Sequence, residues 1–328
     1  MPRMLPTKFG HFYYISLLLN LLILVGCREG PRSDAPLVLQ TNWAPQPEDG
    51  GFFHASESGL FEEEGIDVEV RPASAGMNIY SHVAAGEADF GISVLAKLSV
   101  AINRGLPLVA VASYRPATLR VLLLHEDDPV QDFPDLNHRM VKARGEDLWL
   151  KYLQHEYKLE MRIVPHDFGL GQFLAQDDLI QQGLLTSEPY TLKERGVPVR
   201  ILELSKAGWE NPEVIFCRRD LLEQDPELVA KVVRASLKGW DEFLRGDAEE
   251  TLAWLAKENP ARSIESMRWA RDELTKMYGE SGVWTGDDFG KISPEKVERI
   301  LSILKTLGAV GDSLSVEELV DFSIGERI

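Results

Sequence analysis

The stretch of sequence that most constrains the fold is residues 37–70, which reads LVLQTNWAPQPEDGGFFHASESGLFEEEGIDVEV. A strand-like segment opens it, a turn rich in Pro and Gly follows, and a helical segment leads to a second strand-like segment. An α/β fold places its ligand in the turn that follows such a strand. The turn predicts a surface for a small planar or anionic molecule, because it combines flexible backbone with flat side chains: Trp43, Gly50, Gly51, Phe52 and Phe53.

The same alternation of strand-like and helical segments continues along the chain, and it is typical of an α/β protein. We expect strands at 37–42, 66–72, 90–94, 106–113, 119–125, 139–143, 161–165, 199–204 and 214–217. We expect helices at 51–64, 78–85, 96–104 and 146–158. After residue 220 the chain is helical, with helix N-caps at Asp225, Ser293 and Ser315.

An α/β beginning, an α/β middle and a helical end predict two lobes, each a sheet flanked by helices. We expect the first lobe to comprise 37–117 plus 218–328, with the C-terminal helices packed back on it, and the second lobe to comprise 118–217. The chain then crosses between the lobes twice, near 115–125 and 205–220. Such a hinge leaves a cleft that can close around a ligand.

The first 26 residues have the character of a secretory signal peptide. Arg3 and Lys8 precede an apolar run of about 13 residues, which is shorter than the roughly 20 residues of a membrane-spanning helix. The run ends in LVGC, which resembles a bacterial lipobox and implies lipidation of Cys27. Residues 27–36 then form a polar tether. The alternative is an ordinary signal peptide that happens to contain a cysteine.

Charge and cysteine content exclude several classes of protein. The formal net charge is −17 and falls to −19 without Arg3 and Lys8, which argues against nucleic-acid binding. Beyond Cys27 the only cysteine is Cys217, so neither an internal disulfide nor a cysteine metal site is expected. Cys217 lies in an apolar run, which predicts that its small side chain is buried. The histidines lack HExxH spacing, and no GxSxG or P-loop occurs. We therefore expect no metal, no cofactor and no catalytic residues.

Three segments, taken in order, resemble one known family. They are NWAPQPEDGGFFHASESGLFEEEGIDVEV, AAGEADFGIS (84–93) and LAQDDLIQQGLLTSEPYTLKERG (174–196), and they span about 160 residues. Together they are similar to ABC-transporter substrate-binding proteins of the sulfonate, taurine, nitrate and thiamine-pyrimidine-precursor group. The resemblance implies a two-lobed periplasmic-binding-protein fold of type II. It also implies a monomeric lipoprotein, anchored to the membrane outside the cytoplasm, that delivers a small molecule to a permease and its ATPase.

The first lobe supplies most of the candidate ligand-binding residues. Trp43 leads, because aromatic faces stack on flat heterocycles and on cations, although it can instead pack as core. Gly50 and Gly51 let the backbone approach a ligand at a helix N-terminus. One of Phe52 and Phe53 should face the cleft and the other the core. Two later segments add further candidates: Ser74, Ala75, Gly76, Asn78, Ser93 and Val94. The first of these segments offers backbone N–H groups and the Ser74 hydroxyl, and Ser93 and Val94 stand at the end of a strand. The alternative is that Ser74 or Asn78 only caps a helix.

The identity of the residue at position 49 bears on the ligand. The family often carries His where this chain has Asp49. A histidine N–H donates to an anion or a carbonyl, whereas an ionised aspartate only accepts. The exchange favours a ligand with N–H donors, such as an aminopyrimidine, over a sulfonate or nitrate. The alternative is that Asp49 points into solvent.

The second lobe contributes Glu188 and Tyr190 of the SEPY segment, with Asp167 as a weaker candidate. The Glu188 carboxylate can hold an amino group of a stacked ring, or it can simply cap the helix at Pro189.

We expect a non-catalytic solute-binding protein of an ABC importer. One alternative is an enzyme on the same fold, since some relatives resemble pyrimidine synthases that consume their own His and a pyridoxal cofactor. That reaction needs a Lys and a His facing the cleft, and His54 and His82 lie near the right loops. The other alternative is a sensor module that docks on a membrane receptor kinase.

Overall fold

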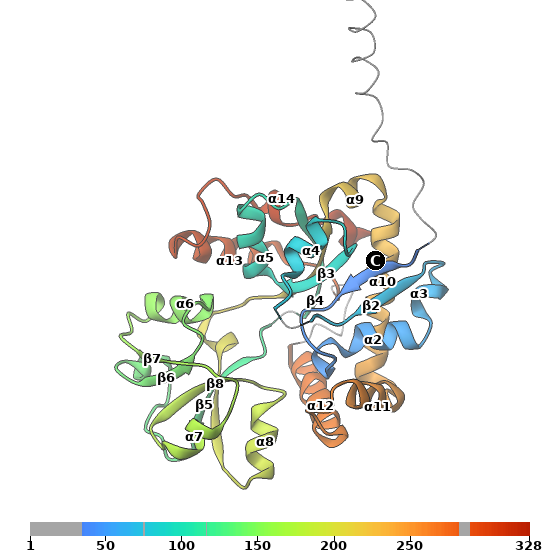
Figure 1. Cartoon of the computed structure of the whole chain (residues 1–328). Helices are drawn as coiled ribbons and strands as arrows, with labels where there is room; N and C mark the ends of the chain where they lie inside the picture. Colours follow the sequence, from blue (N-terminus) through green and yellow to red (C-terminus); the bar gives the residue numbers. More distant parts are fainter. Residues whose placement is uncertain (1–34, 75, 116, 282–288) are drawn as a thin grey trace, which may run out of the picture. The chain divides into compact units, whose positions relative to one another are not determined.

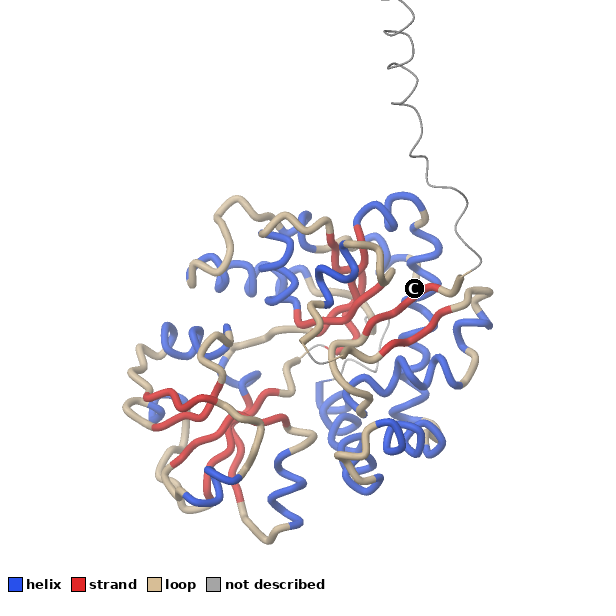
Figure 2. The backbone as a smooth tube through the Cα atoms, in the orientation of Figure 1, coloured by secondary structure: helices blue, strands red, loops and turns tan. Residues whose placement is uncertain are grey.

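Two five-stranded sheets form the centres of two lobes (Figure 1 and Figure 2). The computed structural model describes residues 35–74, 76–115, 117–281 and 289–328, and both lobes lie within Pro36–Ile328. The first sheet has the strand order β2-β1-β3-β10-β4, and the second has the order β7-β6-β8-β5-β9. The strands are β1 (Leu37–Gln40), β2 (Val68–Arg71), β3 (Phe90–Val94), β4 (Leu108–Arg115), β5 (Arg120–His125), β6 (Met140–Ala143), β7 (Arg162–Pro165), β8 (Leu179–Leu184), β9 (Val199–Glu203) and β10 (Glu213–Arg218).

Helices flank both sheets, so the two-lobed α/β fold expected from the sequence is confirmed. The first lobe carries α2 (Gly50–Glu57), α3 (Leu60–Glu63), α4 (Ile79–Ala84), α5 (Leu95–Asn103), α9 (Arg219–Gln224), α10 (Pro226–Arg245), α11 (Glu249–Glu258), α12 (Ile264–Ser281), α13 (Pro294–Thr306) and α14 (Val316–Leu319). The second lobe carries α6 (Leu148–Glu156), α7 (Gly171–Ala175) and α8 (Glu188–Glu194). Within the described ranges, no helix has both the length and the apolar character needed to cross a membrane.

The helix starts expected in the C-terminal third are confirmed by their capping hydrogen bonds. The side chain of Asp225 accepts from the Leu228 N–H, and that of Ser293 accepts from the Lys296 N–H. Ser315 and Glu318 form a capping box in which each side chain bonds the other residue's backbone N–H.

Strand β10 belongs to the first sheet, although it follows the whole second lobe in sequence. It runs antiparallel between β3 and β4, with Phe216 opposite Gly91 and Ala110. The lobe boundary expected at 217 therefore falls inside a strand of the first lobe. We propose that the lobes are joined by two crossings, one that ends at 117–119 and one at 204–212, and that the second lobe ends before Glu213.

Two local differences from the expected elements have physical reasons. The helix expected over 51–64 is two helices, α2 and α3, because Gly59 adopts a left-handed backbone conformation with φ of 72°. Strand β8 is not predicted by the sequence pattern because two polar residues, Gln181 and Gln182, interrupt its apolar run. Both are almost completely buried in the second sheet. They are buried because β8 lies between β5 and β6, although their side chains are polar.

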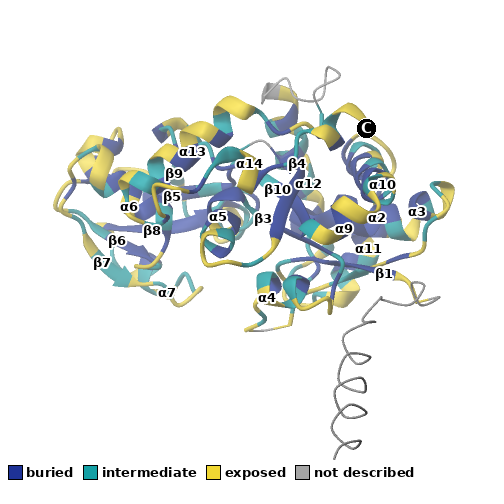
Figure 3. Ribbon diagram, turned by 90° about the horizontal axis from the view of Figure 1, so that it is seen from above, coloured by how far each residue is buried: buried dark blue, intermediate teal, exposed yellow. Residues whose placement is uncertain are grey.

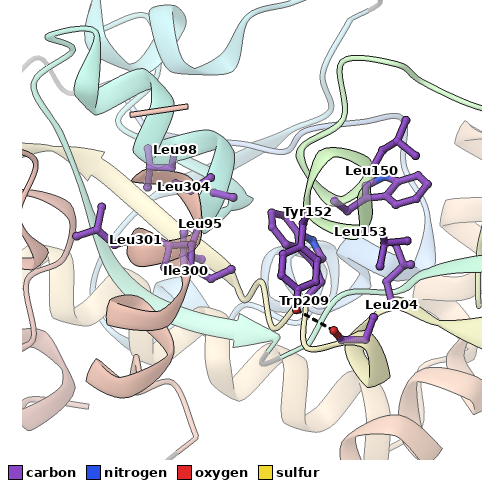
Figure 4. Close-up of a cluster of buried hydrophobic side chains, with 14 of the residues drawn as sticks. Leu95, Leu98, Leu150, Tyr152, Leu153, Leu204, Trp209, Ile300, Leu301 and Leu304 are labelled. Atoms are coloured by element: carbon purple, nitrogen blue, oxygen red, sulfur yellow. Dashed lines mark hydrogen bonds between the residues drawn. The ribbon is translucent and has the colours of Figure 1, made fainter. Parts of the chain in front are cut away.

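Buried residues concentrate along the central strands of both sheets, whereas β7 and β9 of the second sheet are only partly buried (Figure 3). Cys217 is fully buried in β10, as expected, and burial raises the pKa of its thiol. One hydrophobic cluster extends from the first lobe into the second. Figure 4 shows Tyr152 and Trp209 between the two ends of this cluster, and the Tyr152 hydroxyl donates to the Ala207 carbonyl at 2.8 Å. The labelled members of the cluster are Leu95, Leu98, Leu150, Tyr152, Leu153, Leu204, Trp209, Ile300, Leu301 and Leu304.

Candidate functional site

A cavity of about 800 Å³ lies between the two lobes. Its size is in the range of about 300–1,000 Å³ typical of small-molecule sites. Its walls are strand ends and loops from both lobes, which is where α/β folds place ligands. Six of the residues expected from the sequence line it: Trp43, Asp49, Asn78, Ser93, Val94 and Glu188.

Two aromatic side chains from opposite lobes face each other in this cavity. Trp43 follows β1 in the first lobe, and Phe168 follows β7 in the second. Their ring centroids are 6.3 Å apart, with an angle of 34° between the ring planes. Trp43 is 54% exposed and Phe168 65% exposed, unlike core aromatics. The alternative of Trp43 as a core residue is therefore wrong, and its ring is available to a ligand.

Asp49 lies at the floor of the cavity, where a short 3₁₀ turn, Pro47–Asp49, leads into α2. Its side chain is 1% exposed, and its Oδ2 atom has no hydrogen-bond partner among the described residues. Burial raises the pKa of Asp49 well above its ordinary value, Arg115 counteracts part of this, and the nearby carboxylates of Glu213 and Glu48 add to it. The alternative of a solvent-facing Asp49 is therefore wrong. A carboxyl that keeps its proton can donate as well as accept, which widens the chemistry expected from the sequence.

Arg115 compensates the acidic floor from the end of β4. Its guanidinium is 2% exposed, and it pairs with Glu213 at 2.5 Å and donates to the Glu48 carbonyl at 3.1 Å. The Tyr114 hydroxyl donates to the same Glu213 oxygen at 2.5 Å. These contacts join β4, β10 and the turn before α2. The floor of the cavity is thus a network of charged groups anchored on three separate segments.

The raised pKa of Asp49 makes the stability of the protein depend on pH in a defined direction. The folded state holds this proton over a pH range in which the unfolded chain has lost it, so stability falls as pH rises above about 3.9. We expect Asp49→Asn, which carries no charge, to melt a few degrees higher than the unmodified protein at pH 8 and at the same temperature at pH 4. Calorimetric melting between pH 4 and pH 8 measures this difference. A difference that does not change with pH would contradict it.

Another wall of the cavity is already closed by contacts between the lobes. Arg262, after α11, pairs with the Glu48 carboxylate at 3.0 Å and donates to the Thr186 carbonyl of the second lobe at 2.8 Å. The Thr186 hydroxyl donates to the same carboxylate. Nearby, Tyr190 of α8 packs against Trp269 of α12, with ring centroids 5.5 Å apart. These contacts require the lobes to be close together on this side.

A further wall of the cavity is basic. Lys97 lies 4.0 Å from Asp147 of the second lobe, and Arg144 pairs with Glu146 at 2.7 Å. Burial lowers the pKa of Lys97, Asp147 opposes this, and the neighbouring charges of Arg120 and Arg144 lower it further. Among the described residues, five acidic and five basic side chains line the cavity, so it is close to neutral in a chain of formal charge −17.

Four candidates from the first turn lie in the core and not in the cavity. A Cβ atom on Gly51 would come within 2.6 Å of the Trp240 Cα, and one on Gly50 would meet the ring of Phe243. Both glycines serve the close approach of α2 to α10. Phe52 and Phe53 are 0% and 2% exposed and belong to the hydrophobic core of the first lobe. The expected contact of these four residues with a ligand is corrected accordingly.

The remaining candidates divide between capping and packing. Asn78 caps α4 by accepting from the Ser81 N–H, so the alternative of a capping role is confirmed for this residue. Glu188 accepts from the Leu184 N–H at the end of β8 at 2.8 Å, and α8 has Ser187 as its N-cap residue, so Glu188 does not cap that helix. Ser74 and Gly76 are exposed beside the cavity without lining it. Tyr190 is absent from the cavity walls because its ring packs on Trp269. Ala75 and Cys27 lie outside the described residues.

Several cavity residues carry no recognisable signal in the sequence. Arg262 follows a helix far from the first turn, and no motif links it to Glu48. His166 and Phe168 belong to the segment HDFG. Because this segment matches no motif, its sequence does not indicate that these two side chains line a cavity. The left-handed backbone of Phe168, with φ of 62°, is visible only in the structure. Asp167, the weaker candidate of the same segment, does not line the cavity.

Comparison with solved structures agrees with this architecture. The periplasmic aliphatic sulphonate-binding protein SsuA from Escherichia coli superposes with a TM-score of 0.69 at 15% identity, covering 88% of this chain and 92% of that one. Two sheets, two crossings and a cavity between the lobes define the class of periplasmic-binding-protein folds.

Sequence comparison identifies the family. The chain belongs to the NMT1/THI5 like family, whose model matches residues 46–249. The formylaminopyrimidine-binding protein of Halalkalibacterium halodurans is 24% identical over 306 residues, which covers 84% of this chain and 89% of that protein. The 4-amino-5-hydroxymethyl-2-methylpyrimidine phosphate synthase THI11 of Saccharomyces cerevisiae is 25% identical over 238 residues, covering 65% and 67%. One of these two relatives is thus named as a binding protein and the other as an enzyme.

Proposed function

We propose that this protein is the solute-binding component of an ABC importer and that it captures a small heteroaromatic molecule with N–H donors. The observation that carries the proposal is the cavity itself, which is lined both by an exposed Trp43 and by a buried Asp49 whose Oδ2 has no partner among the described residues. A flat ring stacks on the indole. An amino group or ring N–H on that ligand then satisfies the carboxyl oxygen, which a buried polar group requires.

The formylaminopyrimidine-binding relative supports a pyrimidine of this kind as the ligand. A sulfonate fits this proposal less well, because it offers three acceptor oxygens and no N–H donor for the unpartnered Oδ2 of Asp49. On this proposal Glu188 also helps, since one of its oxygens accepts from Leu184 and the carboxylate still lines the cavity.

The remaining parts of the proposal concern the cellular context. We propose a signal peptide over 1–26, lipidation of Cys27, a tether over 27–36 and a position on the outer side of the membrane. The partners are then a permease and an ATPase, and the protein acts as a monomer. The resemblance of LVGC to a lipobox supports the anchor. Solved structures of similar fold that are named as components of ABC transporters or import systems support the partners.

The enzyme alternative has one observation in its favour, since Lys97 and His166 both line the cavity. His54 and His82 do not line it; His54 is bound to Thr251 at 2.8 Å, and His82 pairs with Glu87. His166 uses both ring nitrogens on backbone groups, the Gln182 carbonyl and the Phe168 N–H. A histidine held in this way is suited to a structural role in the cavity wall and not to a reaction, so the arrangement favours a binding protein over a pyrimidine synthase.

The test is a calorimetric titration of the mature protein with formylaminopyrimidine, 4-amino-5-hydroxymethyl-2-methylpyrimidine and an alkanesulfonate. We expect the pyrimidines to bind and the sulfonate not to bind. Trp43→Ala should weaken pyrimidine binding about tenfold, because stacking a base on an aromatic ring contributes about 1–3 kcal/mol. Trp43→Phe keeps an aromatic face and is the matched control, with a smaller loss. If neither pyrimidine binds, the proposed ligand class is wrong.

A further inference from the structure

A lysine inside the second lobe has no place in the binding function described so far. Lys142 lies on β6, and its side chain is 0% exposed. It stands between β7 and β8, opposite Val164 on one strand and Gln181 on the other. Lysine is almost never fully buried unless its ammonium group is paired. The partners of this ammonium group therefore indicate what it does.

Among the residues that the structure describes, the partners lie in the loop that follows β7. The Lys142 ammonium donates to the Gly169 carbonyl at 2.9 Å and pairs with the Asp167 carboxylate at 2.5 Å. The amide of Gln181 donates to the same Gly169 carbonyl at 3.2 Å, and the Gly169 N–H donates to Asp167 at 3.0 Å. Hydrogen bonds from Lys142 and Gln181 thus connect the loop to the middle of the sheet.

These bonds enclose Phe168, which is held in an unusual conformation. Its φ of 62° is in the left-handed region, which a bulky side chain avoids unless its surroundings impose it. Its N–H donates to His166 Nδ1 at 3.1 Å, and Nε2 of the same ring bonds the Gln182 carbonyl at 3.2 Å. The loop is therefore fixed from two sides, and its one large apolar side chain is turned outward with 65% exposure.

The direction of Phe168 is toward the ligand cavity. It lines the cavity and faces Trp43 of the other lobe at 6.3 Å between ring centroids. Two rings that hold a third between them need about 7 Å, since each contact takes about 3.5 Å. The pair is slightly closer than that and its planes are tilted by 34°, so holding a flat ring requires the two side chains to move apart slightly and to turn their faces parallel.

We propose that Lys142 is a positioning residue of the ligand site, which holds the 166–169 loop so that Phe168 forms the second-lobe half of an aromatic clamp with Trp43. The inference rests on the proposed function, because it takes the ligand to be a flat ring. It assigns Phe168 to ligand contact and Lys142 to the placement of Phe168. Lys142 does not line the cavity and contacts no ligand itself.

The first measurement needs no ligand. Lys142→Met removes the ammonium group and keeps an unbranched apolar side chain, and hydrogen exchange then reports on the amides of Phe168 and Gly169. We expect both amides to exchange at least tenfold faster in this variant. Lys151→Met, at an exposed position of α6, is the matched control and should leave them unchanged. Unchanged exchange in Lys142→Met would overturn the inference. If that variant does not fold, Asp167→Asn at the exposed end of the ion pair replaces it.

The second measurement is a double-mutant cycle on the affinity for formylaminopyrimidine. Phe168→Ala and Lys142→Met should each weaken binding about tenfold, and the double variant should be no weaker than Phe168→Ala alone. Losses that multiply to about a hundredfold would show that Lys142 acts by another route and would overturn the inference. If the unmodified protein does not bind this pyrimidine, the proposed function fails, and the exchange experiment still decides whether Lys142 holds the loop.

Discussion

Replacing Arg115 with methionine is expected to remove about 3–5 kcal/mol from the free energy of unfolding, the usual result when one partner of a buried ion pair is lost. Arg115 is 2% exposed and Glu213 is 12% exposed. Without the guanidinium, Glu213 is left next to the carboxyl groups of Asp49 and Glu48 in a place with little access to water. The Glu48 carbonyl also loses its 3.1 Å hydrogen bond. The floor of the cavity thus depends on one cation.

The effect should also depend on pH. Arg115 counteracts part of the rise that burial gives to the pKa of Asp49, so its removal raises that pKa further. The folded variant then holds the Asp49 proton over a wider pH range than the unfolded chain. The loss of stability should therefore be smallest near pH 4 and grow as pH rises.

Chemical denaturation at pH 7 and pH 4, followed by circular dichroism, measures both effects of Arg115→Met. The double variant Arg115→Met/Glu213→Gln removes the stranded charge as well and should recover part of the loss at pH 7. Arg268→Met breaks an exposed ion pair with Glu249 and is the control, with little change in the denaturation midpoint. If Arg115→Met behaves like Arg268→Met, the buried network does not stabilise the fold.

The local elements can be predicted from the sequence because each depends on nearby residues. Phe90–Val94 is a strand as expected, since it is apolar and bounded by turn residues. The cap at Ser293 and the helix that follows it are recognisable from one turn of sequence. Strand β8 shows the limit of this reasoning, because Gln181 is buried only by virtue of its neighbours β5 and β6.

The site is harder to predict, because its residues meet only through the fold. Arg115 and Glu213 are 98 residues apart, and Glu48 and Arg262 are 214 apart, so no spacing rule connects them. Trp43 is recognisable because an aromatic residue in a turn after a strand has few other roles. The two glycines of α2, at positions 50 and 51, mislead for the opposite reason. A pair of glycines suits close approach to a ligand and close approach to a helix equally well, and the helix in question is α10.

That helix contact gives the second large expected effect, in Gly239→Ala. A Cβ atom on Gly239 of α10 would come within 2.5 Å of the Ala55 Cβ and 2.9 Å of the Ala55 N on α2. Neither atom can rotate away, because both are fixed to the helix backbone. The two helices must therefore separate, and we expect a loss of about 3 kcal/mol in the free energy of unfolding, at the upper end of the usual cost of overpacking a core. Thermal and chemical denaturation measure it.

The matched control is the same substitution where no atom is in the way. Gly279 lies in α12, and a Cβ there would meet nothing within 4 Å. Gly279→Ala should stabilise the protein by about 0.5–1 kcal/mol through the higher helix propensity of alanine, the opposite sign to Gly239→Ala. Two substitutions of equal effect would show that helix packing at Gly239 is not tight.

Since Asp49 is the N-cap residue of α2, a displaced α2 also moves the carboxyl group at the cavity floor. Gly239→Ala should therefore weaken pyrimidine binding, although Gly239 does not line the cavity and affects Asp49 through the displacement of α2.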